Sequence, residues 1–135
     1  MILDFKHAAS GRFCWLDLVA TDAAEAEAFY ARLFGWASDP QAANGGTFTR
    51  LRHTGQDVGS MYQMSRKQFE HGIPSHWTPY VKVDGLSDVA EQAERLGGGI
   101  LVSPFTVSGI ARIALIQDSV GAPVGLWESL PAIAP

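Results

Sequence analysis

The chain repeats one pattern of secondary structure, and this repeat limits the fold more than any other feature of the sequence. Shifting the chain by 63 positions places one predicted helix, in "TDAAEAEAFYARLFGW", over a second, in "LSDVAEQAERLGG". The shift superimposes the apolar positions of the two helices: Ala26 on Val89, Tyr30 on Ala93, and Leu33 on Leu96. A shift of 66 places "DVGSM" on "PVGLW" and Gly59 on Gly125, which needs only a small difference in loop length. Self-similarity of this kind predicts two similar structural modules.

Each module is predicted to consist of a strand, a helix and further strands. Apolar alternation indicates the strands, and apolar spacing of three or four residues indicates the helices. Thr21 or Asp22 is the candidate cap of the first helix, with Glu25 three residues beyond Asp22 as in a capping box. Gly35 predicts the end of this helix, and Ser87 is the candidate cap of the second. Module one (about 13–64) has predicted strands at 13–20, 47–53 and 57–64, a helix at 21–36 and a loop at 39–46. Module two (about 76–128) has predicted strands at 76–83, 100–105, 111–117 and 123–129 and a helix at 86–98. Residues 65–75 are predicted to be a linker between the modules.

Length and composition fit one globular domain over residues 1–135. The chain is 47% hydrophobic and 18% charged, which is typical of a folded protein with a core. Each module alone, at roughly 55 residues, is too short for a large core, so we expect the two modules to form a single domain.

Charge and hydropathy exclude several classes of partner. The net charge is −4 and no Lys/Arg cluster is present, so we expect no nucleic-acid partner. No apolar run approaches the roughly 20 residues that span a bilayer, and the N-terminus lacks the apolar region of a signal peptide. Cys14 is the only cysteine, which rules out an internal disulfide, and it is predicted to be a small buried hydrophobic residue. We therefore expect a cytoplasmic protein that does not bind membranes.

Three stretches carry a resemblance to a known superfamily. They are "DLVATDAAEAEAFYARLFGW", "VKVDGLSDVAEQAERLGG" and the closing turn and strand "QDSVGAPVGLWE", which together belong to residues 13–128. With the duplicated layout, the chain resembles the vicinal oxygen chelate superfamily, which includes glyoxalase I, bleomycin-resistance proteins and extradiol dioxygenases. The resemblance implies an α+β fold of two tandem βαβββ modules, whose curled sheets form a cup-shaped pocket with helices outside. It also implies a homodimer.

The resemblance allows the metal site of the superfamily to be compared with this chain. Metal-dependent members hold one divalent ion with His, Gln or Glu on the first and last strands of each module. The corresponding positions here are Trp15, Gly59, Thr78 and Gly125. Indole and glycine side chains cannot ligate a metal, and one threonine hydroxyl is a poor ligand. We therefore expect a protein without metal or other cofactor.

Strand parity extends these four positions to a predicted pocket lining. Side chains alternate across a strand, so residues two positions away face the same side. The expected ligand-binding residues are Trp15, Asp17, Gly59, Met61, Thr78, Tyr80, Gly125 and Trp127, with His76 as a further polar point. The opposite parity places the apolar sets Leu16/Leu18, Val81/Val83 and Val124/Leu126 on the helix side. A planar aromatic ligand stacked between the two indoles would suit this lining.

Each of these residues also has a structural interpretation. Trp15 and Trp127 equally fit core filling, and Asp17 equally fits an ion pair with Lys82. A single histidine such as His76 is more often hydrogen-bonded or exposed than catalytic. A metal site of His53, His76 and Glu128 would require Glu128 to face the cup, whereas parity places it on the helix side.

Two functions follow from these patterns. The favoured one is a metal-free protein that binds a small hydrophobic or aromatic molecule in the cup. The alternative is a lyase, isomerase or dioxygenase of the glyoxalase superfamily acting on a small metabolite, with Asp17, His76 or Tyr80 as candidate acid or base.

Overall fold

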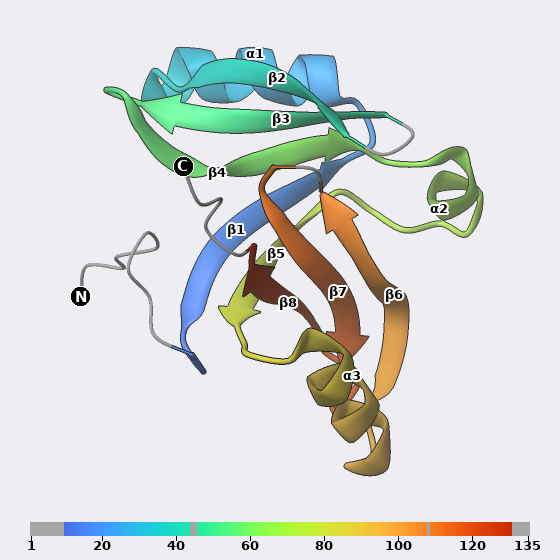
Figure 1. Cartoon of the computed structure of the whole chain (residues 1–135). Coiled ribbons are helices and arrows are strands. Elements are labelled where there is room, and N and C mark those ends of the chain that lie inside the picture. The colour runs from blue at the N-terminus through green and yellow to red at the C-terminus, as the bar shows by residue number, and fades with distance from the viewer. Residues whose placement is uncertain (1–9, 44–45, 108, 131–135) are drawn as a thin grey trace. The chain divides into compact units, whose positions relative to one another are not determined.

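The computed structural model describes residues 10–43, 46–107 and 109–130. Its elements are β1 (Phe13–Ala20), α1 (Ala23–Phe34), β2 (Ala37–Ala43), β3 (Gly46–His53), β4 (Gln56–Gln63), α2 (Arg66–Glu70), β5 (His76–Lys82), α3 (Leu86–Arg95), β6 (Gly99–Val107), β7 (Ala111–Gln117) and β8 (Pro123–Ser129) (Figure 1). The chain divides into two compact units. The first unit is Leu16–Thr78, and the second unit is Met1–Trp15 together with Pro79–Pro135.

The two units share one strand topology. In the first unit the strand order is β2-β3-β4-β1, with β1 parallel to β4 and the other pairs antiparallel. In the second unit the order is β5-β8-β7-β6, with β5 parallel to β8 and the other pairs antiparallel. Each sheet therefore places the first strand of a module beside its last strand. The shared topology confirms the repeat and the α+β class with two βαβββ modules.

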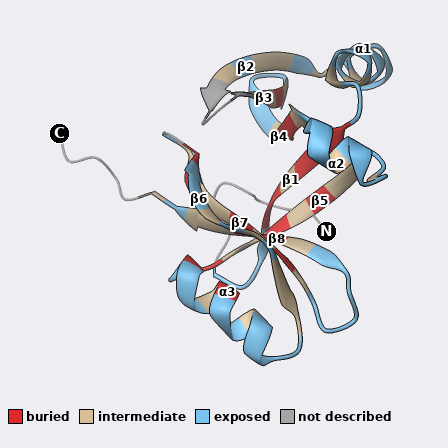
Figure 2. Cartoon of the chain, turned by 90° about the vertical axis from the view of Figure 1, so that its right-hand side faces the viewer, coloured by how far each residue is buried: buried red, intermediate tan, exposed pale blue. Residues whose placement is uncertain are grey.

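The core of the first unit lies between α1 and its sheet. Asp22 caps α1 by accepting a hydrogen bond from the Glu25 amide, and Gly35 ends the helix in a left-handed conformation, as predicted. The helix packs Ala23, Ala26 and Tyr30 against Leu18, Ala20, Leu51 and Met61 of the strands. No residue of α1 is fully buried, and Figure 2 shows much of its surface in the colour of exposed residues. The helix thus contributes one side to the core and leaves the other to solvent.

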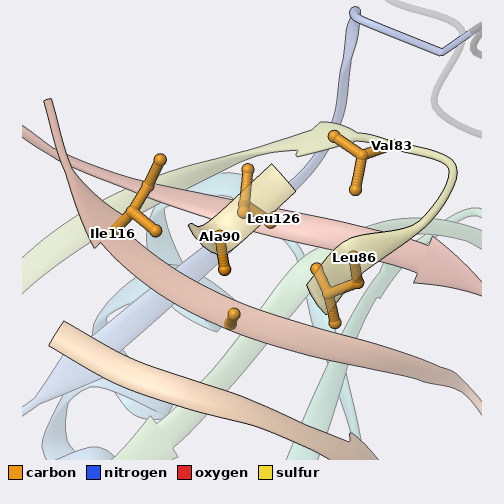
Figure 3. Packing of buried hydrophobic residues seen from close by; sticks show 6 residues of the cluster. Val83, Leu86, Ala90, Ile116 and Leu126 are labelled. Atoms are coloured by element: carbon orange, nitrogen blue, oxygen red, sulfur yellow. The ribbon is translucent and has the colours of Figure 1, made fainter. Parts of the chain in front are cut away.

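The core of the second unit lies between α3 and strands β7 and β8. Leu86 and Ala90 of α3 pack against Val83, Ala114, Ile116 and Leu126 (Figure 3). The partly buried Val81 and Val124 pack against the same cluster. The predicted helix side of β5 and β8 is therefore confirmed.

The structure differs from the predicted elements in three places. Residues 39–46, expected as a loop, contribute most of β2 and the first residue of β3, because pairing with β3 satisfies backbone groups that a free edge would expose. The expected linker contains α2, whose capping box joins Ser65 and Gln68. Ser87 does not cap α3; the N-cap is Gly85, and the amides of Gly85 and Leu86 donate hydrogen bonds to the Glu128 carboxylate. Among the described residues, no helix has the length and apolar character of a membrane span.

Candidate functional site

Three aromatic side chains of the second unit pack together, and we call them the aromatic group: Trp15, Tyr80 and Trp127. The ring centroids of Trp15 and Trp127 lie 5.1 Å apart, with an angle of 31° between the planes. Tyr80 packs nearly perpendicular to Trp127, at 6.2 Å and 86°. Trp15 and Tyr80 are buried, whereas Trp127 is only half-buried. The group brings together three residues of the predicted pocket lining.

The geometry of this group corrects the expected mode of stacking. A ring inserted between two indoles needs about 7 Å between their planes, since each aromatic contact takes about 3.5 Å. The indoles of Trp15 and Trp127 are too close for that, at 5.1 Å between centroids. The two rings contact each other, so no ligand ring fits between them.

Gly125 lies directly under the ring of Tyr80. The two residues are register partners on β8 and β5. A Cβ atom added to Gly125 would collide with Cγ, Cδ2 and Cε2 of the Tyr80 ring. The Tyr80 ring therefore fills the space beside Gly125 and leaves none there for a ligand.

A polar group lies in the first unit, where Asp17, Ser60 and Thr78 are all buried. The Ser60 hydroxyl donates a hydrogen bond of 2.6 Å to Oδ1 of Asp17. Asp17 is 4% exposed. Burial raises the pKa of its carboxyl to about 7, although the hydrogen bond from Ser60 lowers it in part. Asp17 can therefore hold or release a proton near neutral pH, which is the property of an acid–base residue.

The register of β4 corrects the predicted position of Met61. Asp17 pairs with Ser60 and Leu18 with Met61, so Met61 packs on the helix side in the same cluster as Leu18. The parity prediction fails because it assumed that Gly59 faces the cup. Gly59 pairs with Leu51 of the helix-side cluster, so Gly59 and Met61 both lie on the helix side. The register shift between Leu51 and Arg52 leaves Val58 packed against the same cluster. A Cβ at Gly59 would collide with the Leu16 carbonyl oxygen, so only glycine allows this approach of strands.

Sequence parity did not select two residues on the other side of β4, Ser60 and Tyr62. Ser60 contacts Asp17, and Tyr62 lies two residues further along β4. Burial raises the pKa of Tyr62, the Gln68 side chain lowers it in part, and the Asp17 charge raises it further. Glycine inside a predicted strand was the available signal, because such glycines often mark irregular pairing.

Two of the remaining polar candidates have structural partners. His76 Nδ1 lies 2.8 Å from the Pro74 carbonyl oxygen, which fits a hydrogen bond donated by the ring. Glu128 accepts hydrogen bonds from the amides of Gly85 and Leu86, at 2.9 and 3.0 Å, and one from Arg112. These amide bonds lower the pKa of Glu128, led by that from Leu86. Glu128 therefore caps α3, and it faces the helix as parity predicted.

Cys14 is buried in β1. Burial raises the pKa of its thiol to about 11, which leaves almost no thiolate at neutral pH. The prediction of a buried, unreactive cysteine agrees with this environment.

Comparisons with known proteins identify relatives of the chain. No family model matches the chain. It is 33% identical to CFP32 of Mycobacterium tuberculosis, provisionally named a glyoxylase, over 85% of this chain and 44% of that protein. It is 31% identical to the anthracycline biosynthesis protein DnrV of Streptomyces peucetius, over 89% of this chain and 48% of that protein. The chain thus spans about half the length of the curated relatives it matches.

Solved structures share the fold. Methylmalonyl-CoA epimerase from Mycobacterium tuberculosis superposes with a TM-score of 0.63 at 16% identity, over 92% of this chain and 93% of that one. The relatives and the shared fold fit the resemblance of the chain to the vicinal oxygen chelate superfamily. A methylmalonyl-CoA epimerase in complex with methylmalonyl-CoA, another structure with this fold, has a TM-score of 0.61 at 17% identity, over 94% of this chain and 100% of that one.

The metal site of the superfamily does not fit the residues of this chain. Trp15 packs on Trp127, and Tyr80 covers Gly125. At Gly59 a side chain of any kind would strike the Leu16 carbonyl. Thr78 alone offers an oxygen donor, and divalent ions need several. The four corresponding positions therefore lack both the donors and the space that a metal ligand requires.

Proposed function

We propose that this glyoxalase-superfamily protein binds a small hydrophobic or aromatic molecule without a metal. The observation that carries the proposal is the aromatic group, in which Trp127 is half-buried while Trp15 and Tyr80 hold its indole from two sides. A rigid, partly accessible indole offers a flat apolar surface at low entropic cost. Of the other predicted lining residues, Met61 packs in a hydrophobic core and the Tyr80 ring covers Gly125, so the proposal does not include these two.

One of the relatives supports the proposed class of ligand. DnrV is named for the biosynthesis of anthracyclines, which are planar polycyclic aromatic compounds. Such rings suit stacking on an indole face. The relative is a longer protein, so an anthracycline-like ligand for this chain is only a proposal.

Ligand binding is testable with daunorubicin, an anthracycline, as the probe. We expect quenching of tryptophan fluorescence that saturates with daunorubicin concentration, and at least a tenfold weaker affinity in Trp127→Ala. Trp77→Phe is the matched control, because Trp77 belongs to the Tyr30 cluster of the first unit. Absence of saturable quenching, or equal affinity in both variants, would count against binding at the aromatic group.

A second candidate function is acid–base catalysis, and the buried carboxyl of Asp17 favours it. Burial raises the pKa of the Asp17 carboxyl to about 7, close to neutral pH. This candidate is the lyase, isomerase or dioxygenase alternative, with the reaction unassigned. General acid–base residues contribute about 10²–10⁴-fold to rate. Any activity found should therefore fall by at least that lower factor in Asp17→Asn; an unchanged rate would exclude Asp17.

Three further properties belong to the proposal. The protein binds no metal, acts in the cytoplasm and forms a homodimer. Metal analysis of protein purified without chelator tests the first, and one stoichiometric Ni, Zn, Fe or Mn per chain would contradict it. Sedimentation velocity tests the homodimer.

A further inference from the structure

One side of α1 is exposed and apolar at its centre. Glu25, Ala28, Phe29 and Arg32 recur at the i, i+3, i+4, i+7 spacing that forms one stripe of a helix, and we call this stripe the outer α1 face. All four residues are exposed, and Phe29 is 56% exposed. The neighbouring Leu33 is 57% exposed and widens the apolar area.

The outer α1 face carries opposite charges at its two ends. Glu25 lies in the first turn and Arg32 in the last. Within the described part of the chain neither side chain has an ion-pair partner. The midpoint of the helix falls between Ala28 and Phe29, so the acidic and basic ends lie at equal distances from it.

We infer that the outer α1 face pairs with the same face of a second copy of this chain, with the two helices antiparallel. A two-fold axis beside Ala28 and Phe29 makes such an interface self-complementary. It sets Glu25 of each copy opposite Arg32 of the other and brings the two Phe29 rings together at the centre. This inference rests on the proposed homodimer and names its surface.

The small area of the outer α1 face predicts a weak dimer. A helix of 12 residues is about 18 Å long, so α1 alone offers less area than the roughly 800 Å² per partner of a standard interface. We expect a weak dimer, with a dissociation constant in the micromolar range, that dissociates further as salt screens the exposed ion pairs.

The test uses the full chain in sedimentation velocity over a range of concentrations. Glu25→Arg and Arg32→Glu should each weaken dimerisation at least tenfold through like-charge contacts, and the double variant should recover to within about threefold of the original affinity. Phe29→Ser should also weaken it at least tenfold. Leu96→Ser is the control, because Leu96 is similarly exposed but lies in the second unit. Thermal melts confirm that each variant is folded.

A cross-link checks the register independently of affinity. Ala28→Cys should form a disulfide-linked dimer on mild oxidation, whereas Ala31→Cys, exposed on another side of α1, should not. A monomer at every concentration would overturn both the homodimer and its surface. If the charge reversals and Phe29→Ser leave the dimerisation affinity unchanged, and Ala28→Cys forms no cross-link, the protein is a homodimer but the α1 interface is wrong.

Discussion

The ring of Tyr80 on β5 covers Gly125, its register partner on β8, so closely that residue 125 has no room for a side chain. The position where metal-dependent relatives carry a ligand is thus occupied by a neighbouring aromatic ring. Tyr80 also packs nearly perpendicular to Trp127.

Gly125→Ala should destabilise the protein by about 1–3 kcal/mol, because the Tyr80 ring must move to admit the methyl group. In a Tyr80→Ala background the same substitution should cost less than about 0.5 kcal/mol, since the obstacle is gone. Urea unfolding of the four proteins gives the coupling energy. Equal costs in both backgrounds would show that the ring does not restrict residue 125.

Gly59→Ala should destabilise more than Gly125→Ala. The new methyl group meets the backbone carbonyl of Leu16, which cannot rotate away as a side chain can. Truncation of the neighbouring side chain in Leu16→Ala should therefore give no rescue, in contrast to the Tyr80 pair. Full rescue in the double variant would contradict the backbone clash.

The stability of the protein should depend on pH because the carboxyl of Asp17 is buried. Its pKa is about 7 in the folded state, against an ordinary value of 3.8 in the unfolded chain, so the folded state binds more protons between these values. The free energy of unfolding should fall by a few kcal/mol as pH rises from about 4 to 7, at about 1.4 kcal/mol per pKa unit. Above pH 7 it should change little.

Asp17→Asn should remove this pH dependence. The amide oxygen can still accept from Ser60, and no charge is buried, so the variant should be more stable than the original protein at pH 8. Urea unfolding at pH 4.5 and pH 8 measures both effects. Asp57→Asn is the control, because Asp57 is partly exposed and pairs with Arg50. Parallel curves for the original protein and Asp17→Asn would disprove the raised pKa.

Glu128→Ala should lower the free energy of unfolding by about 0.5–2 kcal/mol, the usual effect of losing a helix cap, because the Gly85 and Leu86 amides lose their acceptor. The pKa of Glu128 is lowered on folding, so its contribution is present above its ordinary pKa and is lost as pH falls below it. Acid titration of the original protein, but not of Glu128→Ala, should show this loss. Binding of daunorubicin should be unaffected, which separates the cap from the proposed site.

The sequence by itself determined the repeated modules and much of their layout. Apolar periodicity placed α1, α3 and most strands, because each element must bury one side. Capping residues fixed both ends of α1, and parity correctly set Val83 and Leu126 toward α3. These are local or nearest-neighbour properties, which short stretches of sequence carry.

Tertiary structure decided what depends on neighbouring strands. β2 forms only because β3 offers a pairing edge, although its sequence resembles a loop. The pairing of β4 with β1 and β3 puts Gly59 and Met61 on the helix side and Ser60 beside Asp17, which the sequence of β4 alone did not reveal. Glu128 caps a helix more than thirty residues earlier in the chain. Sequence spacing specifies which residues can face one side, but the packed backbone decides which of them meet, and burial then sets the pKa of Asp17.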